Sequence, residues 1–159
     1  MLYWEDRGYC LVVVGKFMKK SPTIAQLLNA YAPPMIWAGL IFFLSNQSTL
    51  PSATYPLLDY IFKQGAHVFV YAILHFLIWR AIKITTSSTH NQIRLLLLPI
   101  FLTFIYALTD EFHQSFISGR EASVIDIGFD SVGIIISYYL THPQKQIHSH
   151  KPQNTDDKR

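Results

Sequence analysis

The sequence predicts an all-α fold, namely a four-helix transmembrane bundle with both termini in the cytoplasm. Half of the 159 residues are hydrophobic and only 14% are charged, whereas a soluble domain carries roughly 25% charged residues. Four apolar stretches approach the length of a membrane span. Lysine and arginine gather in the segments that one side of such a bundle would share. The single cysteine, Cys10, excludes an intrachain disulfide and a cysteine-based metal site.

Residues 1–26 are predicted to form an N-terminal segment that precedes the bundle. Glu5 and Asp6 stand where a signal peptide carries positive charge, so this segment does not fit a signal peptide. Met18 is followed by two lysines and looks like a better translation start than Met1. Residues 1–17 are then an upstream extension, and both starts stay open at this point.

The first span is predicted over residues 27–44, which carry no charge. Pro33 and Pro34 lie near its start, where prolines either begin a helix or kink it. The other predicted elements follow in chain order: a polar turn at 45–52, a short amphipathic connector at 53–62 around Asp59, a second span at 64–82, a polar loop at 83–94, a third span from Leu95 and a fourth at 123–141. The bundle domain thus covers residues 27–141, and residues 142–159 are predicted to be a disordered polar tail in the cytoplasm.

The basic residues predict the orientation of these four spans. Only Lys63 and Arg120 lie in the loops of one side. The other side holds Lys16, Lys19, Lys20, Arg80, Lys83, Arg94, Lys145, Lys151, Lys158 and Arg159. Because cytoplasmic segments carry the excess of lysine and arginine, both termini are predicted in the cytoplasm. The net charge of +3 then reflects topology rather than nucleic-acid binding, since the basic residues flank apolar runs.

Residues 109–130, TDEFHQSFISGREASVIDIGFD, hold five of the ten acidic residues of the chain. Only 15 uncharged residues separate Arg94 from Asp110, which is about 22 Å of helix against a hydrocarbon core of ~30 Å. The acids are therefore predicted to lie below the lipid headgroups. A charge at such depth costs on the order of 3 kcal/mol, so these side chains are expected to face the bundle interior or a water-filled cavity and to find partners there.

Helical spacing predicts that three polar rows meet at the outer end of the bundle. Residues four apart share one face of a helix. The rows are Tyr106, Asp110 and Gln114 on the third span, Lys63, His67, Tyr71 and His75 on the second, and Asp126 and Asp130 on the fourth. Ser118-Gly119 is predicted to turn the chain after the third span, and Ser123 with Asp126 fits a capping box that opens the fourth.

The acids of this region admit a functional and a structural interpretation. Asp110 and Glu111 are the candidate catalytic residues, as general acid–base groups, or they hold the bundle together electrostatically. Asp126 either binds a ligand or only caps a helix. Asp130 is too deep for capping, and its alternative is a buried pair with Lys63 or Arg120.

The candidate substrate-binding residues are Lys63, His67, Gln114, Arg120, Ser123 and Asp126. A guanidinium binds phosphate or carboxylate through two parallel hydrogen bonds, so Arg120 is the strongest anion contact, unless it pairs with the neighbouring acids. His67 and His113 could ligate a metal with these carboxylates, but no known metal-ligand spacing is present. Whether a metal ion binds here stays open. No cofactor is expected, because the sequence has no P-loop and no dinucleotide fingerprint. Gly133 and Ser137 form a pair of small residues four apart that predicts close helix packing.

The chain resembles the VanZ-like family of small bacterial membrane proteins over about residues 31–140. Three pieces carry the resemblance: FFLSNQSTLP at 42–51, the row Lys63, His67 and Tyr71, and TDEFHQSFISGREASVIDIGFDSVG at 109–133. The matched functional positions are Lys63, His67, Asp110, Glu111, Gln114, Arg120, Ser123 and Asp126. Ser118 replaces an expected proline, and Asp130 replaces a frequent asparagine. The resemblance implies a four-helix membrane domain and a link to resistance against the glycopeptide teicoplanin, with no defined reaction.

These observations lead to one preferred function and two alternatives. We expect a multi-pass protein of the bacterial inner membrane with a polar pocket at its outer face. The pocket would bind or modify an anionic cell-envelope molecule, with membrane lipids as neighbours and no nucleic-acid partner. A non-catalytic membrane scaffold and a small transporter are the alternatives, and the transporter is disfavoured because a carrier needs its site near the middle of the membrane. Whether the protein is an enzyme, and its oligomeric state, stay open.

Overall fold

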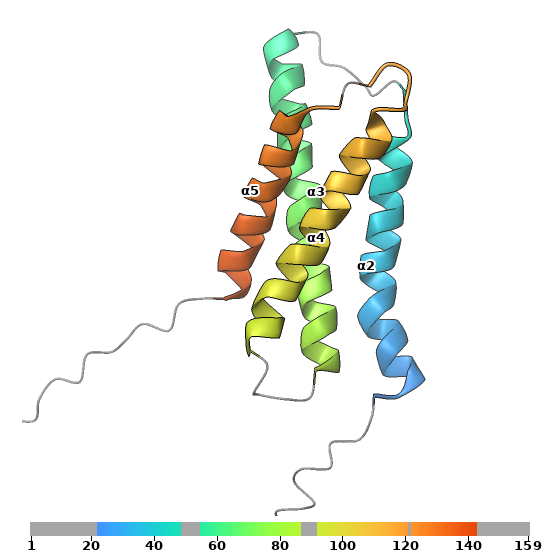
Figure 1. The fold of residues 1–159 in the computed structure, drawn as a ribbon, viewed down its shortest axis with the longest axis vertical. Coiled ribbons are helices and arrows are strands. Elements are labelled where there is room, and N and C mark those ends of the chain that lie inside the picture. Colours follow the sequence, from blue (N-terminus) through green and yellow to red (C-terminus); the bar gives the residue numbers. More distant parts are fainter. Residues whose placement is uncertain (1–21, 49–54, 87–91, 121, 143–159) are drawn as a thin grey trace, which may run out of the picture.

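The computed structural model confirms an all-helical fold. It describes residues 22–48, 55–86, 92–120 and 122–142. Most of the predicted N-terminal segment (1–26) and nearly all of the predicted tail (142–159) lie outside these ranges. The described helices are α2 (Ile24–Ser45), α3 (Pro56–Thr85), α4 (Gln92–Gln114) and α5 (Val124–Thr141), with no strand in the same ranges (Figure 1). All four are long and apolar enough to cross a membrane.

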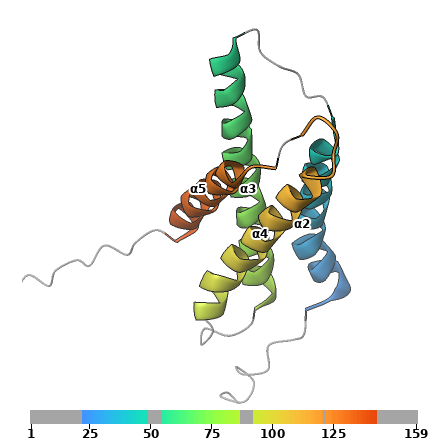
Figure 2. The ribbon, with the colours of Figure 1, turned by 45° about the horizontal axis from the view of Figure 1, so that its top comes forward.

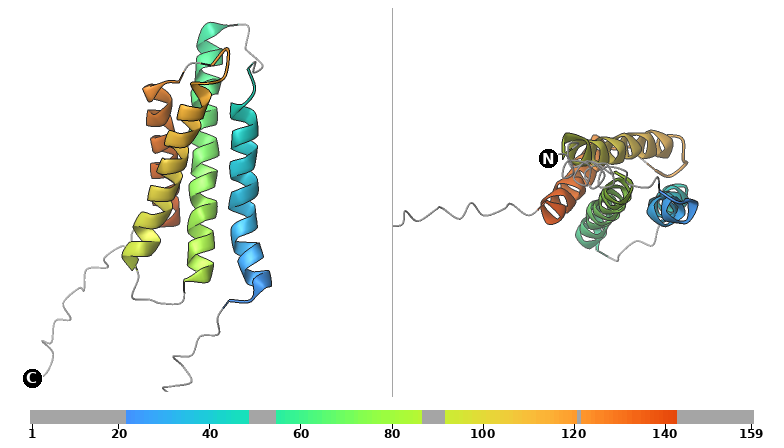
Figure 3. Two further views of the ribbon diagram at one scale, coloured as in Figure 1. Left: turned by 45° about the vertical axis from the view of Figure 1, so that its right-hand side comes forward. Right: turned by 90° about the horizontal axis from the view of Figure 1, so that it is seen from below.

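Helix α3 is the centre of the bundle, because it packs against each of the other three helices. Seen from below, α2 and α5 lie on opposite sides of α3, and α4 covers one flank (Figure 3). The first and last described residues lie at the same end of the bundle, as four spans require (Figure 1). The opposite end holds the C-terminal ends of α2 and α4 and the N-terminal ends of α3 and α5, and it contains the polar residues predicted to meet (Figure 1).

The predicted connector at 53–62 is wrong, because this segment belongs largely to α3. The helix starts at Pro56, where proline is well suited since a first-turn residue needs no N–H donor. No glycine or proline follows before Lys63 to interrupt it. At 30 residues α3 is about 45 Å long, longer than a hydrocarbon core of ~30 Å. Its first turns therefore project beyond the neighbouring helices (Figure 2).

Helix α2 begins upstream of its two prolines. Thr23 and Gln26 form a reciprocal capping box, in which the Gln26 side chain accepts the Thr23 N–H at 2.9 Å and Thr23 Oγ1 accepts the Gln26 N–H at 3.3 Å. Pro33 and Pro34 consequently lie inside the helix rather than at its start. Pro99 likewise lies inside α4. The sequence left the role of Pro33 and Pro34 open, and the capping box decides against a helix start at these prolines.

Helices α3 and α5 approach so closely that only glycine fits at their contact. A Cβ atom on Gly133 would lie 2.2 Å from the Val68 carbonyl oxygen. One turn further, Ser137 Oγ lies 2.9 Å from His75 Nδ1. The predicted packing role of the Gly133–Ser137 pair is confirmed. This contact fixes the face that α5 turns toward α3, and therefore the position of its two aspartates.

Candidate functional site

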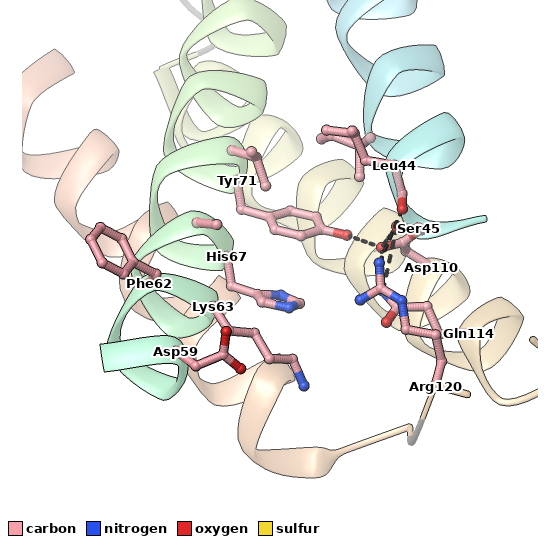
Figure 4. A pocket seen from close by; sticks show the side chains of 13 residues that line it. Leu44, Ser45, Asp59, Phe62, Lys63, His67, Tyr71, Asp110, Gln114 and Arg120 are labelled. Atoms are coloured by element: carbon pink, nitrogen blue, oxygen red, sulfur yellow. Dashed lines mark hydrogen bonds between the residues drawn. The ribbon is translucent and has the colours of Figure 1, made fainter. Parts of the chain in front are cut away.

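A cavity of about 370 Å³ lies at the end of the bundle where α2 ends and α3 begins. Its walls come from α2, α3, α4 and the loop that follows α4 (Figure 4). The lining residues are Ile41, Leu44, Ser45, Asp59, Phe62, Lys63, Ala66, His67, Val70, Tyr71, Asp110, Gln114 and Arg120. The lining combines aliphatic and aromatic side chains with charged, amide and hydroxyl-bearing side chains, so it is amphiphilic.

The α3 wall contains the polar row predicted from the sequence. Lys63, His67 and Tyr71 follow each other at a spacing of four and all reach the cavity. His75, the next member, does not line it and instead contacts Ser137 in the α3–α5 interface. The row thus splits into three cavity residues and one packing residue.

Asp110 is held by three uncharged donors from three helices. Its Oδ2 atom accepts from Ser45 Oγ at 2.8 Å, from Tyr71 OH at 3.1 Å and from Gln114 Nε2 at 3.1 Å (Figure 4). The other carboxylate oxygen, Oδ1, is buried and has no hydrogen-bond partner among the described residues. The predicted stripe of Asp110 and Gln114 is therefore real, because α4 continues through both residues.

Arg120 reaches the cavity from the turn after α4. Gly119 adopts a positive φ of 84°, a conformation that glycine tolerates and that turns the chain back toward α2. The guanidinium donates from Nε to the Gln47 carbonyl at 3.2 Å and from Nη2 to the Leu44 carbonyl at 3.0 Å. Within the described ranges it forms no ion pair with a carboxylate. The alternative in which Arg120 neutralises the neighbouring acids is thus not the arrangement seen here.

Asp126 and Asp130 face α3 and do not line the cavity. Lys63 Nζ lies 2.9 Å from Asp126 Oδ2, and Gln64 Nε2 donates to Asp126 Oδ1 at 3.0 Å. His67 Nδ1 lies 2.9 Å from Asp130 Oδ1, and its Nε2 atom lies 3.7 Å from Asp126. The structural alternative for Asp130 was a buried pair with Lys63 or Arg120, and its actual partner is His67. The sequence could not choose because the choice depends on how α5 is rotated against α3.

The predicted capping box at the start of α5 is only half correct. Ser123 is the N-cap, and its hydroxyl accepts the Ile125 N–H at 3.2 Å. Asp126 does not return the bond, because its carboxylate points to Lys63 and Gln64. The Ser123 N–H donates to Glu111 instead. Glu111 thereby ties the end of α4 to the start of α5.

His113 is separated from His67 by its packing. Its ring stacks on Phe42 with the centroids 4.8 Å apart, and it is not a cavity residue. Across the residues that the structure describes, no group of three or more histidine, cysteine, aspartate and glutamate side chains is arranged to hold a metal ion. His113 therefore contributes to the packing of α4 against α2 and not to the cavity.

The structure divides the eight predicted site residues into two sets. Lys63, His67, Asp110, Gln114 and Arg120 line the cavity. The others, Glu111, Ser123 and Asp126, lie at the start of α5 outside the cavity lining.

The cavity lining also contains three polar residues that are not among the predicted site residues: Ser45, Asp59 and Tyr71. Tyr71 was detectable from its place in the Lys63–His67 row. Ser45 carried a weaker signal, as the first polar residue after an uncharged span. Asp59 was hidden by the wrong connector, since only a continuous helix puts it one turn before Lys63.

Comparison with known proteins identifies one family. The family model described as VanZ/LLP1 matches residues 8–143. No curated protein matches the chain. No solved structure matches it either.

Proposed function

We propose, from the premise that the chain belongs to the VanZ/LLP1 family, that this multi-pass membrane protein binds the anionic head of a cell-envelope molecule in the cavity between α2, α3 and α4. One observation carries the proposal. Lys63 and His67 on α3 and Arg120 in the turn after α4 line the same cavity, together with a set of apolar side chains. The protein would act in the bacterial inner membrane, with the cavity end on the outer side.

The three nitrogen-bearing side chains suit a phosphate or carboxylate group. Arg120 already uses Nε and Nη2 on backbone carbonyls, and its Nη1 atom has no hydrogen bond among the described residues. Lys63 keeps 38% of its side chain exposed beside Asp126, so its ammonium can also contact a ligand. Charge-assisted hydrogen bonds of this kind are roughly twice as strong as those between neutral groups.

The apolar part of the lining suits a lipid-linked molecule rather than a free ion. Ile41, Leu44, Phe62 and Val70 supply hydrocarbon surface next to the polar end. An amphiphile could place its headgroup against Arg120 and its chain along α2 and α3. Asp110 would be the residue that exchanges a proton with such a ligand, since Glu111 lies outside the lining.

The test compares Arg120→Ala with Arg94→Ala, which removes an exposed arginine at the opposite end of α4. Purified protein in nanodiscs is examined by native mass spectrometry for retained phosphatidylglycerol. Loss of one charge-assisted contact, about 1.5–3 kcal/mol, should weaken binding roughly 10- to 100-fold in Arg120→Ala and leave Arg94→Ala unchanged. The link to teicoplanin is tested in parallel, by growth of strains that produce each variant at equal membrane level.

The scaffold alternative makes the opposite forecast for the same variants. If the polar residues only hold the helices together, Arg120→Ala should reduce the amount of folded protein in the membrane. Lipid retention per folded molecule and teicoplanin susceptibility would then match the wild type. That outcome would contradict the proposed binding site.

The orientation is tested by cysteine labelling in a Cys10→Ser background. Ser48 follows α2 at the cavity end, and Ser87 lies in the sequence between α3 and α4. With the cavity end outside, Ser48→Cys should react with an impermeant maleimide in intact cells, and Ser87→Cys should react only after lysis. The reverse pattern would place the cavity in the cytoplasm.

A further inference from the structure

The two oxygens of the Asp110 carboxylate are in different situations. All three hydrogen bonds, from Ser45, Tyr71 and Gln114, converge on Oδ2. Oδ1 is buried and receives none from the described residues. A buried polar atom normally has a partner, and one without a partner calls for an explanation.

The hydrogen-bond donors of Asp110 are also all neutral groups. The residue is buried, at 6% exposure. No lysine, arginine or histidine of the described ranges forms an ion pair with it. Burying a carboxylate without a cation is costly. The site would therefore gain from a ligand that brings a positive charge.

The neighbourhood favours a single positive charge over a metal ion. A calcium or magnesium ion takes at least six oxygen ligands, and the described residues hold no suitable acid cluster. An ammonium group needs only one acceptor of this kind, together with the hydroxyl oxygens nearby. A ligand hydroxyl could also donate to Oδ1, but it would leave the negative charge unbalanced.

We propose that the ligand headgroup carries both a phosphate and a protonated primary amine. Asp110 takes the ammonium, while Arg120 and Lys63 take the phosphate. Figure 4 shows the required layout, with Lys63 and His67 on the α3 side and Asp110, Gln114 and Arg120 across the cavity. This proposal rests on the proposed function and adds the second charge of the ligand. The same chemistry occurs in an aminophospholipid and in a soluble aminoalkyl phosphate.

The experiment uses two lipids that differ only at nitrogen, phosphatidylethanolamine and its N-acetylated form. Both keep the phosphate, and only the first has an ammonium. Native mass spectrometry of the full-length protein in nanodiscs should show about tenfold tighter binding of phosphatidylethanolamine. Asp110→Asn, which keeps the shape, should abolish this preference. Glu111→Gln, the same change at the adjacent buried acid outside the cavity, should retain it, and Arg120→Ala should weaken both lipids.

The outcomes separate this proposal from the proposed function. Equal binding of the two lipids that still depends on Arg120, with no Asp110-dependent binding of soluble O-phosphoethanolamine, would overturn the amine and leave the anion site standing. Absence of any Arg120-dependent binding would overturn both. A titration with soluble O-phosphoethanolamine distinguishes the sources. Binding of this compound that depends on Asp110 and Arg120, without lipid selectivity, would support the same chemistry from a soluble ligand. The wild-type comparison suffices should Asp110→Asn fail to fold.

Discussion

Buried acids lie on two sides of α3, and the two groups differ in the partners of their carboxylates. The cavity acid group consists of Asp110 with Ser45, Tyr71 and Gln114. The α5 acid group consists of Asp126 and Asp130 with Lys63, Gln64 and His67. The exposures are similar, at 6% for Asp110 and 1% for each of the other two. Their partners differ, because the α5 aspartates have basic side chains and Asp110 has neutral donors only.

This difference indicates which buried acids hold helices together and which buried acid a ligand could contact. A buried carboxylate that is paired with a basic side chain on the next helix has a partner for its charge, and the pair can fix the register of the two helices. A buried carboxylate that is held by neutral donors keeps both its charge and one oxygen for a further partner. The two α5 aspartates therefore explain how α5 is docked on α3, and Asp110 is the buried acid that a ligand would contact.

Asp130→Ala is expected to cause the largest loss of stability. His67 would be left in the α3–α5 interface without its closest anion, 2.9 Å away in the wild type. Removing one partner of a buried pair costs about 3–5 kcal/mol, and the lower value applies here because a histidine can lose its proton. Unfolding in a denaturing detergent titration measures the effect. The double variant Asp130→Ala/His67→Leu should recover part of it. Wild-type stability of the single variant would show that the pair does not hold α5.

Gly133→Ala should follow, through a steric mechanism in the same interface. The added Cβ would meet the Val68 carbonyl at 2.2 Å, and backbone atoms cannot step aside as a flexible side chain can. Overpacking of this kind costs about 1–3 kcal/mol. Gly128→Ala on the same helix is the matched control, since nothing lies within 4 Å of its Cβ, and it should be neutral or slightly stabilising. Equal stability of the two variants would mean that α3 and α5 are not in close contact there.

The sequence was sufficient for the fold and for part of the site. Composition and length predicted four spans, and a spacing of four predicted the Lys63–His67–Tyr71 and Asp110–Gln114 rows. Small residues at Gly133 and Ser137 predicted a close contact. These features depend on one helix at a time. The partners of Asp126, Asp130 and Arg120 depend on how two helices are rotated against each other, and a single sequence contains no measurement of that rotation.

The missed start of α3 has a different cause. In the sequence, Lys63 marks the predicted edge of a span, because a charge usually lies at the membrane surface. The helix nevertheless continues through Lys63, because no glycine or proline interrupts it, and Asp126 on α5 accepts the Lys63 ammonium at 2.9 Å. The predicted edge of the span is therefore not the start of the helix. Asp59, the cavity acid one turn earlier, was missed for the same reason.

Asp110→Asn should have the smallest effect on stability, and it tests the comparison most directly. The carboxamide oxygen can replace Oδ2 as the acceptor for Ser45 and Tyr71, and the substitution removes a buried charge that has no cationic partner. We therefore expect the free energy of unfolding to stay within about 1 kcal/mol of the wild type or to rise, as is common when a functional site is neutralised. Asp130→Asn, measured in the same titration, should lose more, because its charge faces His67. If Asp110→Asn proves as destabilising as Asp130→Asn, then both acid groups serve helix packing. The unpartnered Oδ1 atom of Asp110 would then give no support to a ligand site.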